Sequence, residues 1–423
     1  MATTTPLSAA GGRMSRRYGA GHRWVVLSVG VGAQASFAAM FAGIPVTGIA
    51  MRAGYHLSIG DLGLALACLG LGAAVSDIVW GLLTDRYGDR RVLLIGLTST
   101  GALLALMAAA VTPGDGAGVA ALAACLLAAG ALGGSVNGAS GRAIMTWFAD
   151  GERGLAMSIR QTAIPAGGAL GVAVLPWLAH SYGFRAVYVF PAALCLLAAA
   201  ATWRWLPISD APAAGREVAT ARKESVPARA VTRSPLLRWD VWRVALASAL
   251  LTVPQFAVLS FTAIFLHDAK GQGVALASVT ILIAQIGGGA ARIWTGRRTD
   301  RRGNRRTYLR GIGVLTGIAM AAAAVLTQAP TPVTVAALAL GGLLANSWHG
   351  IAYTEIAAMA GPDRAGTALG LEGTTVFGAA FLTPLLIPVV LAAASWEAVW
   401  ALVAAAALLA IPLAPRPLAV TMR

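Results

Sequence analysis

The chain has 423 residues, of which 57% are hydrophobic and 12% are charged. A soluble globular domain carries about 25% charged residues, so this composition excludes an ordinary soluble protein and indicates a multi-pass membrane protein. The net charge of +15 does not indicate nucleic-acid binding, because the basic residues lie between apolar runs, where they act as topology signals.

Twelve apolar runs are long enough to cross the hydrocarbon core of a membrane, which requires roughly 20 residues. In chain order they cover residues 24–50, 61–83, 92–111, 119–147, 154–180, 184–205, 240–266, 274–296, 307–328, 332–354, 366–392 and 395–414. The segment between the sixth and seventh runs is rich in Pro, Ala, Arg and Glu, which is typical of a flexible linker.

These runs predict an all-α membrane protein of twelve transmembrane helices in two six-helix bundles. The predicted parts are an N-terminal tail over 1–23, a first bundle over 24–205, a linker over 206–239, a second bundle over 240–415 and a C-terminal tail over 416–423.

The basic residues predict the orientation of the chain in the membrane. With twelve spans, 26 of the 32 Lys and Arg residues fall on the side that holds both tails and the linker, and three fall on the opposite side. Because cytoplasmic loops carry the excess of Lys and Arg, both termini are predicted to be cytoplasmic. We expect a monomer in a bacterial-type inner (plasma) membrane, in contact with membrane lipids.

The chain lacks the usual signs of a metal site, a disulfide or a nucleotide-driven pump. Cys68, Cys125 and Cys195 lie in apolar runs, and their spacing fits no metal site. No G-x-x-x-x-G-K-[ST] phosphate loop is present, so transport driven by ATP within this chain is not supported. We therefore expect no enzyme activity, no cofactor, no metal and no disulfide.

A short motif occurs twice, at equivalent places in the two halves. GLLTDRYGDRR begins at Gly81 and GRRTDRRGNRR begins at Gly296, 215 residues later. The first copy, between the second and third runs, resembles the signature loop of major facilitator superfamily (MFS) transporters. The resemblance implies a gating role for residues of both loops: Gly81, Asp85, Arg86, Gly88, Arg90, Arg91, Gly296, Asp300, Arg301 and Gly303.

The same resemblance implies a fold and a transport mechanism. MFS proteins place their two bundles around a central cavity, bind substrate near the membrane midplane and alternate access to the two sides. The family also implies a small-molecule substrate. Because no phosphate loop is present, the energy source is expected to be a gradient, of protons or of sodium ions.

Ionisable residues inside the apolar runs are the strongest candidates for functional sites. Each costs at least about 2.5–3.5 kcal/mol to insert at mid-membrane, so those that persist usually face a cavity or a partner. Two pairs obey the internal repeat with opposite charge, since Arg292 follows Asp77 by 215 residues and Glu372 follows Arg160 by 212. The candidates for proton coupling are Glu372, Asp77 and Glu355.

Arg292 carries a second resemblance. The pattern from Arg292 through Gly296 to Asp300 is similar to the eighth helix of monocarboxylate and oxalate–formate transporters, in which this arginine faces the anionic substrate. The acidic partner of the monocarboxylate pattern is replaced here by Gly288. The competing interpretation is that Arg292 closes a salt bridge with an acidic residue of a neighbouring helix.

The segment around Arg160 reads SIRQTAIPAGGALG and combines a charge, an amide and the helix-interrupting Pro165, which opens backbone carbonyl groups. Its P-x-G-G piece resembles the fifth-helix antiporter motif of drug exporters in part. Polar side chains of other runs complete a predicted substrate cavity, whose members are Arg160, Arg292, Gln34, Gln255, Asn137, Asn346, His349 and Tyr353.

Three functions remain open. The first is proton-coupled symport of a small organic anion, a carboxylate, attracted by Arg160 and Arg292 and coupled through Glu372. The second is proton-driven efflux of a drug or metabolite, suggested by the partial antiporter motif. The third is a membrane sensor or scaffold, although the chain carries no soluble domain through which it would signal.

Overall fold

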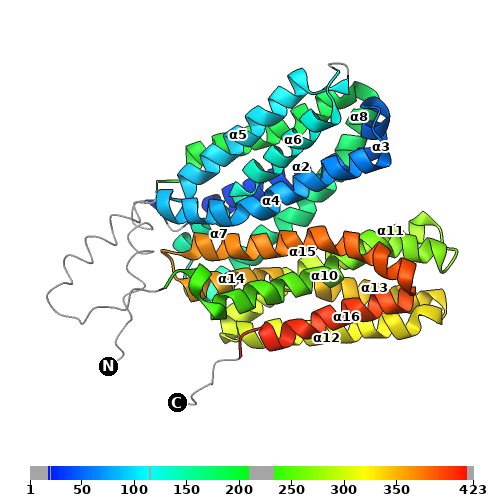
Figure 1. Cartoon of the computed structure of the whole chain (residues 1–423). Helices are drawn as coiled ribbons and strands as arrows, with labels where there is room; N and C mark the ends of the chain where they lie inside the picture. The colour runs from blue at the N-terminus through cyan, green and yellow to red at the C-terminus, as the bar shows by residue number, and fades with distance from the viewer. Residues whose placement is uncertain (1–17, 20, 114–115, 209–232, 417–423) are drawn as a thin grey trace, which may run out of the picture. The chain divides into compact units, whose positions relative to one another are not determined.

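The computed structural model describes residues 18–19, 21–113, 116–208 and 233–416. Most of the predicted N-terminal tail, most of the linker and nearly all of the C-terminal tail lie outside these ranges. The described residues form helices and connecting turns, as Figure 1 shows. The prediction of an all-α membrane protein is therefore confirmed.

In the first half of the chain the helices follow the predicted apolar runs. They are α2 (His22–Val46), α3 (Gly48–Gly54), α4 (Ile59–Tyr87), α5 (Asp89–Ala110), α6 (Val119–Gly133), α7 (Ser135–Trp147) and α8 (Arg153–Trp205).

The second half follows the same plan. Its helices are α10 (Trp239–Asp268), α11 (Val274–Arg302), α12 (Arg305–Val325), α13 (Thr331–Ala345), α14 (His349–Ala360), α15 (Ala365–Ala393) and α16 (Trp396–Leu413). Across the described residues of both halves, eleven helical segments are long and apolar enough to span a membrane.

The longest of these segments contains two spans. Helix α8 has 53 residues, which at 1.5 Å per residue corresponds to roughly 80 Å, more than twice the hydrocarbon thickness of a bilayer. Its backbone leaves the helical region at Gly183, where φ is 73° and ψ is −176°. Because glycine adopts this conformation at little cost, the chain turns there, between the predicted fifth and sixth spans.

Two of the predicted continuous spans are interrupted. The fourth span is divided at Gly134, between α6 and α7, and the tenth is divided between Ala345 and His349, where α13 ends and α14 begins. The two interruptions fall at equivalent places, since Asn346 follows Gly134 by 212 residues. Each interruption leaves backbone groups without their usual helical hydrogen bonds.

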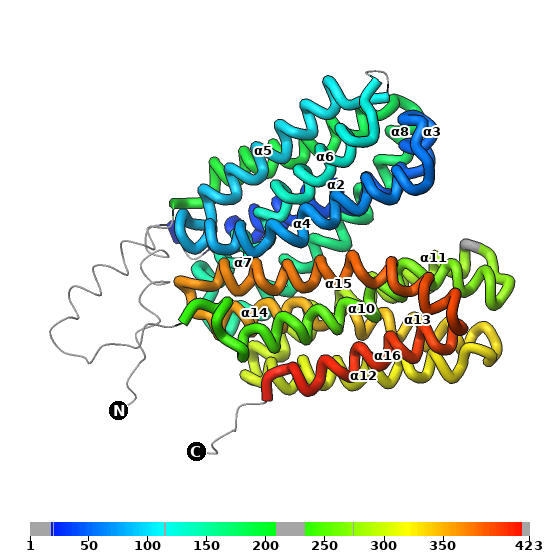
Figure 2. Tube along the Cα trace, in the orientation of Figure 1, coloured from blue at the N-terminus to red at the C-terminus, as the bar shows by residue number. Residues whose placement is uncertain are grey.

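The described helices belong to two compact units. Unit 1 contains the described residues within 1–149, 166–242 and 357–373, and unit 2 contains those within 150–165, 243–356 and 374–423. In unit 1, α4 packs against α6 through glycines, since a Cβ built at Gly130 would lie 2.0 Å from the carbonyl oxygen of Leu69. In unit 2, α12 and α16 run side by side (Figure 2).

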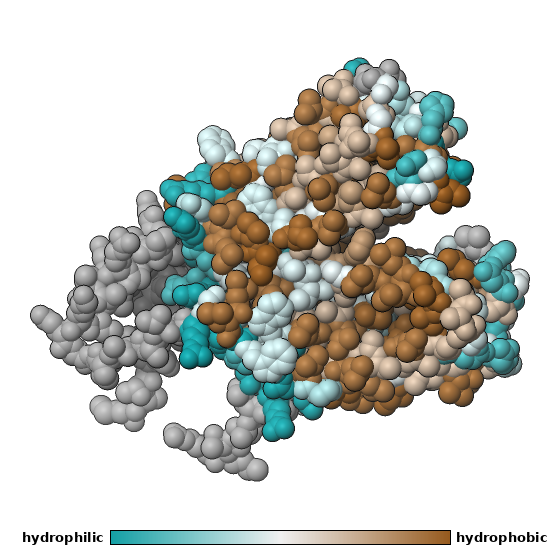
Figure 3. Space-filling model, viewed as in Figure 1, coloured by the Kyte–Doolittle hydropathy of each residue, from teal (hydrophilic) through white to brown (hydrophobic). Residues whose placement is uncertain are grey.

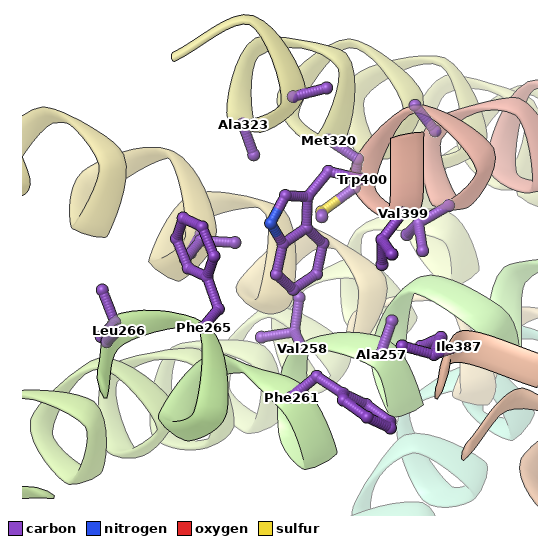
Figure 4. Close-up of a cluster of buried hydrophobic side chains, with 14 of the residues drawn as sticks. Ala257, Val258, Phe261, Phe265, Leu266, Met320, Ala323, Ile387, Val399 and Trp400 are labelled. Atoms are coloured by element: carbon purple, nitrogen blue, oxygen red, sulfur yellow. The ribbon is translucent and has the colours of Figure 1, made fainter. Parts of the chain in front are cut away.

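Large apolar side chains fill the interior of unit 2 (Figure 4). Phe265 of α10 and Trp400 of α16 meet edge to face with ring centroids 5.6 Å apart, and Met320 of α12 packs with them. Figure 3 shows that large apolar side chains also cover much of one outer face. Exposed leucine and valine side chains of α4 and α15 illustrate this pattern, which suits contact with lipid: Leu64, Leu71, Val75, Val79, Leu382, Leu385, Leu386 and Val389.

Candidate functional site

The Arg-rich motif of the first half, residues 81–91, binds the beginning of α15 through Asp85 of α4. One carboxylate oxygen accepts from the backbone N–H of Gly366 at 2.8 Å, and the other accepts from the N–H and the hydroxyl of Thr367 at 2.7 and 2.6 Å. These N–H groups have no acceptor within their own helix, so Asp85 satisfies them and places negative charge at the positive end of α15.

Arg142 of α7 supports this contact, and the sequence analysis missed its role. Its Nε lies 3.5 Å from Asp85, and its Nη1 lies 3.8 Å from Asp89 at the start of α5. A signal was available, because Arg142 is one of three basic residues that fall within the predicted spans.

Unit 2 repeats the arrangement. Asp300 accepts from the backbone N–H groups of Gly154 and Leu155, at the start of α8, at 2.9 and 2.8 Å. The cation near it is Arg305, whose Nη2 lies 3.8 Å away. The two copies of the motif therefore bind equivalent helix starts, and the second copy lacks the hydroxyl contact because Leu155 stands where the first has Thr367.

Glycine pairs bring these helices into backbone contact. A Cβ built at Gly81 would lie 2.4 Å from the carbonyl oxygen of Gly366, and one at Gly296 would lie 2.4 Å from that of Gly154. Any side chain at these positions forces the helices apart, which explains why both copies of the motif begin with glycine. We call the first pair of contacts the α4–α15 seam, defined by Gly81 and Gly366.

The other predicted gating residues lie around the same loops. Gly88 and Gly303 end α4 and α11 with φ of 86° and 64°, values that favour glycine. Arg90 donates to the carbonyl oxygen of Trp203 at 2.7 Å, and the guanidinium of Arg86 lies 5.3 Å from the ring centroid of Tyr87. Two further arginines are exposed, Arg91 and Arg301.

Three predicted residues form a buried chain of hydrogen bonds in unit 1. Gln34 of α2 donates to the Asn137 Oδ1 at 2.9 Å, and the Asn137 Nδ2 donates to both carboxylate oxygens of Asp77 at 3.0 and 3.1 Å. Asp77 is 0% exposed. It also lies directly against α15, because a Cβ built at Gly373 would lie 1.8 Å from its Oδ2.

A second buried cluster surrounds Arg292 in unit 2. Its Nε donates to the backbone carbonyl oxygen of Asn346 and its Nη2 donates to the Asn346 Oδ1 at 3.0 Å, so one edge of the guanidinium is bound by a single residue. Its Nη1 donates to the backbone carbonyl oxygen of Gln161 at 2.9 Å. Arg292 is 2% exposed.

Both backbone acceptors come from helix interruptions. An α-helical carbonyl at position 161 would bond the N–H of residue 165, but Pro165 has none, so the Gln161 carbonyl is available to Arg292. The carbonyl of Asn346 is available because α13 ends at Ala345. The positive charge is thus held by oxygens that regular helices would have used themselves.

The hydrogen bonds of Arg292 all go to neutral groups. Within the described part of the chain, no carboxylate oxygen forms an ion pair with it at 4.0 Å or less. An intramolecular salt bridge of Arg292, the competing interpretation of the sequence, is therefore not seen among these residues.

The remaining candidates occupy separate positions. His349 stacks on Trp348 with ring centroids 3.8 Å apart, and Tyr353 is buried close enough to Arg292 to interact with it electrostatically. Gln255 is buried in α10. Glu355 forms an ion pair with Arg306 at 2.5 Å, which associates it with the Arg-rich loop of unit 2.

Arg160 and Glu372 are both completely buried. The Nη1 of Arg160 approaches the sulfur of Met157 at 3.8 Å. These two residues belong to different compact units, Arg160 to unit 2 and Glu372 to unit 1.

Comparisons with known proteins agree with this geometry. The sequence model of the Major Facilitator Superfamily matches residues 29–380. The chain is 33% identical over 397 residues to the uncharacterized MFS-type transporter Rv2994 of Mycobacterium tuberculosis strain H37Rv, covering 94% of this chain and 86% of that protein. It is 32% identical, with the same coverage, to the uncharacterized MFS-type transporter MT3072 of strain CDC 1551.

Solved structures share the fold at low sequence identity. The proton:xylose symporter XylE matches with a TM-score of 0.72 at 16% identity, covering 93% of this chain and 95% of that one. The human organic anion transporter MFSD10 gives 0.72 at 16% identity, covering 93% and 99%. The paired signature loops, the helical fold and these matches together show that the chain is a multi-pass transporter of the major facilitator superfamily.

Proposed function

We propose that this transporter carries a small organic anion, a carboxylate, in symport with protons. The observation that carries the proposal is the environment of Arg292. A buried guanidinium without a counter-charge is costly, so such groups persist where a partner or a ligand completes the site. Here the described residues supply only neutral oxygens, and an anionic substrate would supply the missing negative charge.

Arg292 retains donors for such a ligand. A guanidinium has five N–H groups, and three are used by Asn346 and Gln161. One N–H remains on each terminal nitrogen, and donors of this kind suit carboxylate oxygens. Arg160, the other fully buried arginine of unit 2, adds to the positive charge of the proposed site.

Carboxylates of unit 1 are the proposed proton carriers. Glu372 and Asp77 are both completely buried. Asp77 lies against α15 at Gly373, the residue that follows Glu372. We assign proton coupling to Glu372, which the internal repeat pairs with Arg160. Glu355 is better suited to gating, because it is paired with Arg306.

Uptake by proteoliposomes tests the proposal. Reconstituted protein is expected to accumulate a labelled carboxylate when the outside is acidified. Arg292→Gln should lower uptake at least tenfold, and Arg292→Lys should restore it only in part, because lysine keeps the charge but loses the planar fork. Arg52→Gln is the control, since Arg52 is exposed and lies outside both Arg-rich motifs.

The efflux alternative predicts a different result. A proton-driven exporter would protect an overexpressing strain against apolar drugs, and that protection would be insensitive to carboxylates. Drug resistance without binding of any carboxylate would contradict the anion proposal.

A further inference from the structure

The side chain of Gln161 is an amide buried without hydrogen bonds. Gln161 lies in α8 and is 1% exposed, and neither its Oε1 nor its Nε2 has a hydrogen-bond partner among the described residues. Buried polar groups are almost always hydrogen-bonded in folded proteins, so each exception requires an explanation. An amide with both ends unfilled needs a partner that donates and accepts.

The backbone of the same residue binds Arg292. The Arg292 Nη1 donates to the Gln161 carbonyl at 2.9 Å, so the guanidinium lies beside the residue that carries the unfilled amide. A ligand held by the remaining N–H groups of Arg292 would lie next to residue 161 of α8. The site therefore combines a charged donor pair with a neutral group that both donates and accepts.

His349 gives an independent indication of unfilled hydrogen-bonding capacity here. Its ring is 5% exposed and lies against the backbone of Asn346, but its Nδ1 meets the geometric criteria for a hydrogen bond with no described residue. It follows Asn346, which binds Arg292 through two oxygens, by three residues. Two residues near the guanidinium, from different helices, thus contain buried polar atoms without partners.

We infer that Gln161 makes the site specific for carboxylates that carry a hydroxyl group on the neighbouring carbon. The inference rests on the proposed anion transport and names its substrate class. The carboxylate accepts from Arg292, while the hydroxyl donates to the Gln161 Oε1 and accepts from its Nε2. A substrate without the hydroxyl leaves both ends of the buried amide unpaired, and such sites discriminate strongly against the analogue that lacks the polar group.

Calorimetric binding to the purified full-length protein tests this inference with matched pairs of acids. The pairs are glycolate with acetate, 2-hydroxybutyrate with butyrate, and malate with succinate. One of the three pairs is expected to bind best to the wild type. Within that pair, the hydroxylated acid should bind at least about tenfold more tightly than the acid without the hydroxyl. Gln161→Met, which keeps the side-chain length without its polar atoms, should abolish that preference and leave the affinity of the hydroxyl-free acid unchanged.

Gln285→Met is the matched control, because Gln285 lies on α11 about two turns before Arg292 and its Oε1 also lacks a partner among the described residues. It should keep the full hydroxyl preference. If Gln161→Met does not fold, Gln161→Leu replaces it, and the wild-type comparison stands without either variant.

Each outcome decides a separate point. Equal binding of the two acids in every pair, or a preference that survives in Gln161→Met, overturns the role of Gln161 while anion transport stands. Failure of all six acids to bind contradicts this inference and the anion proposal together. An effect of Gln161→Met on both members of a pair alike would show a structural role instead, and would also overturn the inference.

Discussion

Pro165 determines which backbone oxygen Arg292 can use. In an uninterrupted helix the Gln161 carbonyl would accept from the N–H of residue 165, and the guanidinium would lose that acceptor. The carbonyl instead lies 2.9 Å from the Arg292 Nη1. One missing N–H on α8 therefore fixes a charge that is carried by α11.

Replacing this proline should weaken anion binding. In Pro165→Ala the new N–H competes for the Gln161 carbonyl, and the guanidinium loses one of the three bonds that orient it. A hydrogen bond to a charged group is worth about 1.5–3 kcal/mol, so we expect a loss of roughly tenfold or more in affinity, measured by calorimetry. Pro388→Ala removes an exposed proline of α15 and should leave affinity unchanged. Wild-type affinity in Pro165→Ala would contradict this account.

The sequence predicted part of this arrangement. A proline inside an apolar run opens a carbonyl by chemistry alone, and a buried arginine requires a partner, so both members were identified as important. Their pairing was not predictable, because the two residues are 127 positions apart and belong to different helices. Gln161 was identified from the sequence only as an amide beside Arg160. Its proposed role depends on the missing hydrogen bonds at both ends of its side chain, which the sequence does not show.

At the scale of helices, the α4–α15 seam depends on the absence of side chains. A Cβ at Gly366 would lie 2.6 Å from the Asp85 Oδ1 and 2.8 Å from the carbonyl oxygen of Gly81. Both atoms take part in the contact, so neither can move aside without disturbing the hydrogen bonds between Asp85 and α15.

Gly366→Ala should therefore destabilise the protein. Overpacking of a close contact typically costs about 1–3 kcal/mol, and the loss is expected as a lower midpoint of thermal unfolding in detergent. Gly378→Ala is the control on the same helix, because a Cβ there meets nothing within 4 Å. That variant should unfold at the same or a higher temperature, since alanine favours a helix interior by about 1 kcal/mol over glycine. Equal effects of the two substitutions would show that the seam does not depend on close approach.

The breaks in the fourth and tenth spans show where prediction from apolar runs stops. Hydropathy reflects the lipid around a span and does not report a break inside it. The run over residues 119–147 stays apolar through Gly134, although the helix is interrupted there. The break near Asn346 does coincide with a polar stretch, Asn346 to His349, but the surrounding run is still apolar enough to be predicted as one span. The residues beside both breaks were nevertheless predicted, since a buried charge or amide stands out in any apolar run.

Across the whole chain, one arrangement is used twice with opposite charge. Each half breaks its fourth helix and brings a buried ionisable residue of its second helix to a nearby amide: Asp77 with Asn137 in unit 1, and Arg292 with Asn346 in unit 2. The internal repeat explains the shared backbone plan. The opposite charges suit different ligands, and the proposed function assigns the anion to unit 2 and the proton to unit 1.

The proposed coupling between anion binding and the protonation of Glu372 leads to a prediction. If an anion at the arginines favours protonation of Glu372, then by reciprocity a lower pH must tighten anion binding by the same coupling free energy. With one coupled proton, affinity should rise by up to about tenfold per pH unit across the range in which Glu372 titrates. Glu372→Gln should bind the anion with no such pH dependence and should not accumulate it against a gradient.

Exchange of labelled for unlabelled substrate separates coupling from general damage. Exchange requires no net proton movement, so it should persist in Glu372→Gln, whereas Arg160→Gln should lose anion binding and with it every mode of transport. Glu397→Gln is the control, because Glu397 lies in the first turn of α16 and bonds to Gln328 at 2.7 Å. It should keep both the pH dependence and accumulation. Retention of pH-driven accumulation by Glu372→Gln would assign the proton to another carboxylate, and Asp77→Asn would then be the variant to lose it.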